Sequence, residues 1–278
     1  MPRLLCFGLP LLLFAPDAFA WGLQTHVFFG QCALFGLPFA DRQLREAAAR
    51  LPALVLAGAC LPDLALAGGA LGTPAFRRAH RWSTLRRLAA APRDDAERVL
   101  ALGYATHLVV DVVAHNQFVP EHEARIARIR YATHALAEWA MDRHVASRLD
   151  AQPAELLRAD RARLAGFVAH AFRCDAALAG RALDWLAGAE RLLRRSPLPA
   201  LSRSVVRFFD RHAGERFDIY VRQTLAALRG AEAALAGALV DWVASDPEGA
   251  GKGQGGDHAA DRRPGEHVAR IVQPEHHA

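Results

Sequence analysis

Apolar positions along this chain repeat at the three- and four-residue intervals of an amphipathic helix. The alternating stretches rich in Val, Ile and Thr that are typical of strands are lacking, whereas Ala, Leu and Arg are abundant. The pattern therefore predicts an all-α protein with a single multi-helix domain. We expect helices over residues 25–35, 41–57, 83–91, 94–116, 121–149, 153–172, 175–195, 198–213 and 215–243.

Capping and breaking residues set the boundaries of these helices. Asp41 and Asp94 are typical N-caps, and Pro153 is typical of a first helical turn. Asn116 with Pro120 predicts the end of a helix. The segment 58–83, which carries several Gly and Pro residues, is predicted to be irregular and to be held in place by metal ligands.

The two ends of the chain differ from the predicted domain. Residues 1–20 combine Arg3, a long apolar run and the exit Ala18-Phe19-Ala20, which is typical of a secretory signal peptide. Residues 246–278 carry few large apolar side chains and are predicted to be a disordered tail. The domain therefore spans 21–245, and we expect a secreted or periplasmic protein that begins at Trp21.

Two apolar stretches, 51–71 and 101–119, approach the length of a membrane span. Pro and Gly residues and Asp63 interrupt the first stretch, and the second carries His107, Asp111 and His115 in its middle. Ionisable groups are costly at that depth of a bilayer. We interpret both stretches as interior segments, so no transmembrane segment is expected in the mature chain.

Charge and cysteine content restrict function only loosely. The formal net charge is +5, which suits contact with an anionic membrane surface or with nucleic acid and identifies neither. Beyond the signal peptide, Cys32, Cys60 and Cys174 remain, and an oxidising compartment favours pairing. A Cys32–Cys60 disulfide is the preferred pairing, since both lie near residues expected to share a metal cluster; three buried free thiols are the alternative.

Metal-binding residue types recur across the first half of the domain. Cleavage after Ala20 would free the α-amine of Trp21, whose pKa near 7.7–8.0 allows it to bind a divalent cation together with its carbonyl oxygen. The other candidates are all residue types that bind zinc. They are His26, Asp63, His80, His107, Asp111, His115, His134 and Glu138.

Three of these candidates follow one another at four-residue steps. On a helix such steps drift by about 40°, so His107, Asp111 and His115 form one stripe with about 6 Å between neighbours. The span of about 12 Å suits two or three ions, with Asp111 bridging two of them. His134 and Glu138 repeat the spacing on the next helix and could close a further site with His115. Taken singly, each could instead be a hydrogen-bonded core residue or a surface ion pair.

With these residues in this order, the chain resembles the zinc-dependent phospholipase C family. That helical fold is shared with fungal single-strand nucleases and with the N-terminal domain of glycosylphosphatidylinositol-specific phospholipase D. The resemblance covers residues 21–142 and implies three zincs, with Asp63 as candidate general base. It places Trp21, His26 and Asp111 on one zinc, Asp63, His80, His107 and Asp111 on a second, and His115, His134 and Glu138 on a third.

The expected activity is zinc-dependent hydrolysis of a phospholipid or another phosphodiester, with phospholipase C-like headgroup cleavage as the first choice. A bound water becomes a nucleophile at neutral pH when zinc lowers its pKa. A single-strand nuclease of the same fold remains an alternative, as does a secreted module in which zinc only stabilises the fold. The four-residue gap from Asp111 to His115 is shorter than the six residues of the best-known family members and is more similar to the phospholipase D branch.

Overall fold

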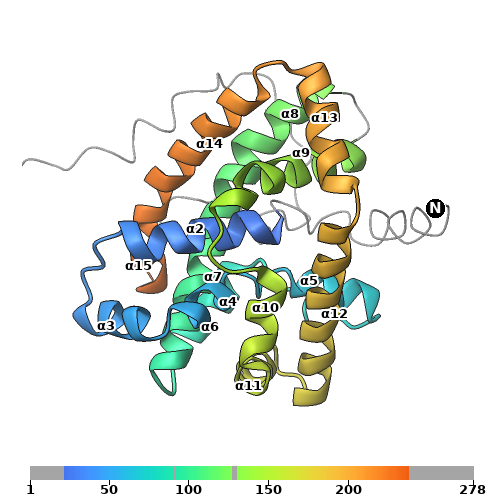
Figure 1. The fold of residues 1–278 in the computed structure, drawn as a ribbon. Coiled ribbons are helices and arrows are strands. Elements are labelled where there is room, and N and C mark those ends of the chain that lie inside the picture. Colours follow the sequence, from blue (N-terminus) through green and yellow to red (C-terminus); the bar gives the residue numbers. More distant parts are fainter. Residues whose placement is uncertain (1–21, 91, 127–129, 238–278) are drawn as a thin grey trace, which may run out of the picture.

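In the computed structural model the described residues, 22–90, 92–126 and 130–237, form helices and connecting turns, with no strand among them (Figure 1). The all-α prediction is therefore confirmed. The signal segment 1–20, Trp21 and the tail 246–278 lie outside the described residues. The helices are α2 (Leu23–Gly36), α3 (Arg42–Arg50), α4 (Pro52–Gly58), α5 (Leu64–Ala70), α6 (Trp82–Ala90), α7 (Asp95–Val113), the π-helix η1 (Ala114–Phe118), α8 (Val119–Ile126), α9 (Arg130–Val145), the 3-10 turn η2 (Ala146–Arg148), α10 (Pro153–Ala159), α11 (Arg161–Phe172), α12 (Ala176–Arg195), α13 (Leu198–Phe209), α14 (Ala213–Ala227), the 3-10 turn η3 (Leu228–Gly230) and α15 (Ala231–Leu235).

A continuous rod made of α7, η1 and α8 runs through the middle of the molecule, and α2 crosses it (Figure 1). Other helices surround this rod, so apolar side chains on most of its sides are buried. Leu100, Leu102 and Tyr104, for example, are fully buried. By length and composition the rod, Asp95–Arg125, could cross a membrane, but 83% of its most apolar window is buried inside the protein. Its hydrophobicity is thus explained by its central position in the core.

The predicted helix end at Asn116 and Pro120 is wrong. The chain widens there into the π-helix η1, and the Val119 N–H bonds the Ala114 carbonyl five residues back. One wide turn lets Pro120, which has no N–H to donate, enter α8 without ending the rod. Pi-turns of this kind often lie at functional sites, and this one carries His115.

Two other predicted helices are divided. The helix expected over 41–57 breaks at Leu51, whose ψ of 46° is not helical, because the following Pro52 disfavours the helical region for its neighbour. The helix expected over 153–172 also breaks, at Asp160, with φ −128° and ψ 56°, although no Pro follows it. The segment 58–83 is not wholly irregular, since it contains α5.

The Cys32–Cys60 disulfide is not formed. Cys32, Cys60 and Cys174 are all free thiols. The Cys60 Sγ lies 3.5 Å from the Leu56 carbonyl within its own helical turn, fully buried. His26 and Asp63 do converge, but the two cysteines near them in sequence are not joined.

Candidate metal centre

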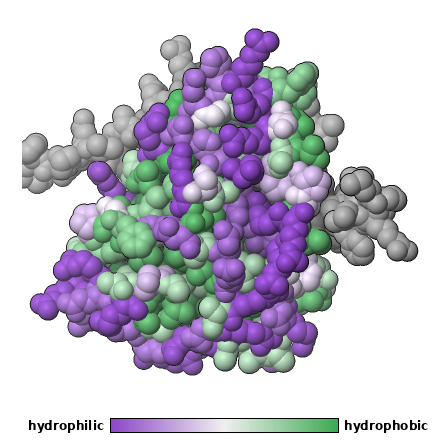
Figure 2. Space-filling model, viewed as in Figure 1, coloured by the Kyte–Doolittle hydropathy of each residue, from purple (hydrophilic) through white to green (hydrophobic). Residues whose placement is uncertain are grey.

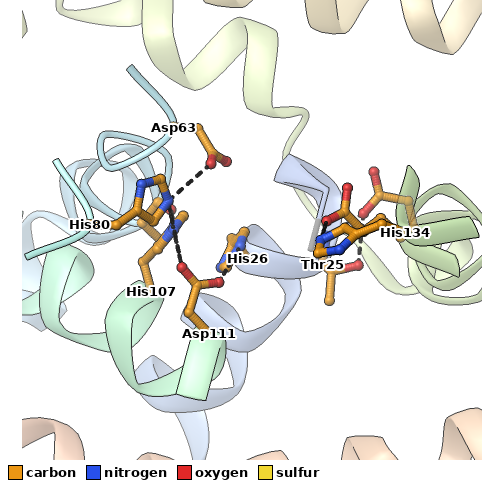
Figure 3. A network of polar contacts seen from close by, with 10 residues as sticks. Thr25, His26, Asp63, His80, His107, Asp111 and His134 are labelled. Atoms are coloured by element: carbon orange, nitrogen blue, oxygen red, sulfur yellow. Dashed lines mark hydrogen bonds and ion pairs between the residues drawn. The ribbon is translucent and has the colours of Figure 1, made fainter. Parts of the chain in front are cut away.

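The centre of the candidate site lies on α7. His107 and Asp111 stand one helical turn apart and are almost completely buried, and His107 Nε2 lies 3.1 Å from Asp111 Oδ2. Burial of a carboxylate is expensive unless a partner offsets its charge. The other donors therefore matter, and they come from three other parts of the chain (Figure 3).

Two glycines fix the orientation of His107. A Cβ at Gly103 would lie 1.9 Å from the Val55 carbonyl oxygen, and one at Gly58 would lie 2.3 Å from the Leu100 carbonyl oxygen. Only glycine permits this close crossing of α4 and α7. The crossing brings the Ala59 carbonyl within 2.7 Å of His107 Nδ1, so the Nδ1–H donates to it. The Nε2 lone pair is then free to face the cluster.

Asp63 and His80 enter from the segment between α4 and α6. Asp63 stands at the start of α5, yet its side chain makes no capping bond there. Instead its Oδ1 lies 3.5 Å from His80 Nε2, which is also 3.5 Å from Asp111 Oδ2 and 3.2 Å from His107 Nε2. Both side chains thus point toward His107 and Asp111 on α7 (Figure 3).

His26 completes the cluster from α2. Its ring stacks on the His107 ring with centroids 3.6 Å apart, and its Nε2 lies 3.4 Å from Asp111 Oδ1. The two oxygens of Asp111 therefore face different histidines, His26 on one side and His80 with His107 on the other. This is the geometry expected of a carboxylate that bridges two ions.

The donor set fits a divalent metal such as zinc. Ligand atoms lie within 4.8 Å of one another in two overlapping groups: His26, Asp63 and His107 in one, His80, His107 and Asp111 in the other. Neither nitrogen of His26 and neither oxygen of Asp111 has a hydrogen-bond partner, although all four atoms are buried. Such unsatisfied atoms are rare in proteins and require an explanation. The His107 Nε2 lone pair faces an Asp111 oxygen, a repulsive contact that a cation would turn into two bonds.

The pKa directions agree with this reading. Burial, helped by the neighbouring His107, lowers the pKa of His26 to about 3, so its ring is neutral and able to bind metal. Burial alone would raise the pKa of Asp111, but His107, His26 and His80 outweigh it and hold that pKa well below its usual range. Burial opposes a charge on His107 as well, yet Asp111 and Asp63 raise its pKa. The carboxylates thus attract a positive charge to this point.

A second group of donors lies on η1 and α9. His134 Nε2 is 2.8 Å from Glu138 Oε1, and the rings of His115 and His134 have centroids 5.7 Å apart. Glu138 is buried, neither of its oxygens is hydrogen-bonded, and burial followed by repulsion from Asp63 raises its pKa well above the usual range. A buried carboxylate beside two imidazoles fits a third metal position. His115 is exposed, unlike His107 and Asp111, so the predicted stripe runs from the core out to the surface.

The structure therefore brings together eight of the nine predicted ligands in two neighbouring groups, and the ninth, Trp21, lies outside the described residues. Trp21 directly precedes Gly22, at the start of α2, four residues before His26. The metal-binding and catalytic roles of these residues stay predictions, since proximity alone does not assign them.

Asp142, which is not among the predicted site residues, is completely buried beside the start of α2. Its Oδ1 accepts from the Thr25 N–H at 2.9 Å and the Thr25 hydroxyl at 2.7 Å, and its Oδ2 accepts from Arg194 at 2.8 Å. A Cβ at Gly22 would lie 2.1 Å from this carboxylate. Asp142 thus holds the backbone that leads into His26. The available signal was the spacing His134-x3-Glu138-x3-Asp142, which continues one helix stripe.

The fold and the site together define an all-helical protein in which His and Asp side chains from separate segments converge on a candidate metal centre. A family model described as zinc-dependent phospholipase C matches residues 25–173, and the chain belongs to this family. The matched range includes His26, Asp63 and Glu138, and with them every predicted ligand except Trp21. No curated protein and no solved structure matched the chain.

Proposed function

We propose that this protein is a zinc-dependent phosphodiester hydrolase that removes phospholipid headgroups in the manner of a phospholipase C. Family membership supports a zinc enzyme of this type. The observation that carries the proposal is the buried contact of the His107 Nε2 lone pair with Asp111, 3.1 Å apart, with His26, His80 and Asp63 around them. Such a contact is favourable with a metal ion or a proton between the two groups, and a metal ion would also give the buried, unpartnered atoms of His26 and Asp111 a partner.

Two to three zincs would be held by donors of this chain. His26 and Asp111, with the α-amine of Trp21, would hold one ion; Asp63, His80, His107 and Asp111 a second; His115, His134 and Glu138 a third. Zinc bound there supplies activation of water at neutral pH and positive charge opposite the phosphoryl oxygens.

Asp63 is the proposed general base. Its carboxylate does not cap α5 and lies on the His80 side of the cluster, where it can accept a proton from an attacking water. In the reaction the water oxygen bonds to phosphorus and the bond from phosphorus to the glycerol oxygen breaks. The glycerol oxygen takes up a proton, so the products are diacylglycerol and a phosphorylated headgroup.

Turnover and zinc content measured together on Asp63→Asn test this role. The amide cannot accept a proton, so we expect most of kcat to be lost while more zinc is kept than in Asp111→Asn. Asp184→Asn is the matched control, because this carboxylate forms a half-exposed surface pair with Arg161. Full activity of Asp63→Asn would refute the assignment.

The substrate is decided by assaying zinc-loaded protein on phospholipids of different headgroup, single-stranded DNA and single-stranded RNA. Release of diacylglycerol supports the proposal, and release of phosphatidic acid would instead indicate phospholipase D chemistry. Hydrolysis of nucleic acid alone would favour the nuclease alternative. Zinc-dependent stability without hydrolysis of any of these substrates would favour the alternative in which zinc only stabilises the fold.

We further propose that the protein acts outside the cytoplasm after removal of residues 1–20. The Ala18-Phe19-Ala20 exit supports cleavage before Trp21. N-terminal sequencing of exported protein tests this, and any other start would remove the α-amine from the metal site.

A further inference from the structure

Helix α13 has two apolar faces, and only one of them is used by the core. Pro199, Ser202 and Val206 are buried, at the spacing of one helix face. This inner face packs chiefly against α9, the helix that carries His134 and Glu138. The remaining apolar residues of α13 face away from the core.

These outward residues form a second stripe, which we call the outer stripe: Leu201, Val205, Phe208 and Phe209. Phe208 is 81% exposed, and Leu201 and Phe209 are each 54% exposed. Seven residues separate Leu201 from Phe208, which places them about 20° apart on the same face. Three of the seven large hydrophobic residues that are exposed in the described part of the chain lie on this helix. Such clustering marks an interaction surface.

Basic residues lie on another face of α13, about 100° or more around the helix from Phe208. Arg203, Arg207 and Arg211 follow at four-residue steps, and no ion pair between described residues includes any of the three. Asp210 lies in the same segment but is buried and bound by Arg216, so it does not neutralise them. Figure 2 shows hydrophobic and hydrophilic residues side by side where α13 approaches α14. The exposed part of α13 is therefore apolar on one face and positively charged on another.

We propose that the outer stripe and its three arginines dock the protein on an anionic phospholipid surface, an inference that rests on the proposed phospholipid substrate. An exposed helix with aromatic side chains on one face and arginines on another is typical of segments that lie in a membrane interface. The arginines would attract anionic headgroups while Phe208 and Phe209 enter the acyl boundary. Since the inner face of α13 packs on α9, this contact leaves only α13 between the membrane and the helix that carries His134 and Glu138.

Sedimentation with vesicles tests the proposal directly. The parent protein is expected to bind vesicles of phosphatidylcholine with added phosphatidylglycerol more tightly than vesicles of phosphatidylcholine alone. The double variant Phe208→Ser/Phe209→Ser should bind these vesicles at least about tenfold more weakly than the parent. Arg203→Gln/Arg207→Gln/Arg211→Gln should lose the preference for the anionic vesicles and its dependence on salt.

Phe35→Ser is the matched control, since Phe35 is 77% exposed on α2 and lies outside the outer stripe. It should bind vesicles like the parent. Equal vesicle binding by the parent and the double variant, or equal weakening by Phe35→Ser, would overturn the proposal. A dimer of the parent that the double variant abolishes would overturn it too, by showing a contact between copies.

Turnover separates this proposal from the proposed function. The double variant should hydrolyse a soluble short-chain phospholipid like the parent and hydrolyse vesicle lipid more slowly. If no substrate is hydrolysed while vesicle binding still depends on Phe208 and Phe209, the enzymatic proposal fails and the docking surface stands.

Discussion

Asp142→Asn is expected to destabilise the fold although Asp142 is not a proposed metal ligand. Its carboxylate is fully buried, and it pairs with Arg194, whose side chain is only 18% exposed. The amide can still accept from Thr25 but offers no charge to Arg194. Removal of one partner from a buried pair costs about 3–5 kcal/mol, because the other charge is left without compensation.

The structure places the effect at the lower end of this range. Arg194 keeps a second partner, Glu190, at 2.9 Å, and a further contact with Gln24 at 3.2 Å. We therefore expect a loss of about 3 kcal/mol of unfolding free energy. For a domain of this size that corresponds to a fall in Tm of roughly 6–12 °C.

Urea denaturation of zinc-free protein in the presence of chelator measures this loss without a contribution from metal binding. Asp184→Asn is the control, because its pair with Arg161 is about half exposed and such surface pairs contribute roughly 1 kcal/mol or less. If Asp142→Asn unfolds within 1 kcal/mol of the parent, on the scale of that surface pair, the reasoning from burial is refuted.

Four further outcomes are expected. Burial raises the pKa of Glu190 to about 7, so this group contributes stability at pH 4.5 that is lost as the pH rises to 7, and Glu190→Gln, compared with the parent by urea denaturation across that range, should flatten the fall in stability with pH. Gly103→Ala should cost about 3 kcal/mol and weaken zinc binding at least tenfold, whereas Gly188→Ala, with open space around it, should not; calorimetry and zinc titration decide. Asp111→Asn should lose zinc in elemental analysis, since a neutral oxygen cannot offset repulsion between two cations. A protein with extra residues ahead of Trp21 should retain one zinc fewer than the processed form; equal zinc content would exclude a role for the α-amine.

Local signals in the sequence predicted helix starts well where a capping side chain determines the first turn. The N-caps at Asp41 and Asp94 form as expected, with side-chain bonds to the backbone N–H groups of Gln43 and Glu97. The break at Leu51 follows from Pro52, a local signal that the sequence does display, whereas the break at Asp160 has no Pro or Gly after it to announce it.

The candidate site shows the same division. The spacing of His107 and Asp111 was sufficient to place them on one helix face, and the family resemblance supplied the more distant donors. Neither could indicate the Ala59 carbonyl that orients His107, because a backbone group has no residue type to read. Arg194 was equally hidden, since 52 residues separate it from Asp142 and only the packing of α12 brings them together.

The crossing of α4 and α7 determines which mutations the metal centre can tolerate. His107 is oriented by a backbone carbonyl, which no substitution at position 59 can delete, so this support is protected against point mutation in a way that a side-chain partner is not. The orientation of His107 is instead sensitive to substitution of Gly58 or Gly103, because a Cβ at either position would clash with the backbone of the other helix. A mutational scan should therefore find two intolerant glycines that supply no metal ligand, and a search for ligand residue types alone would overlook them.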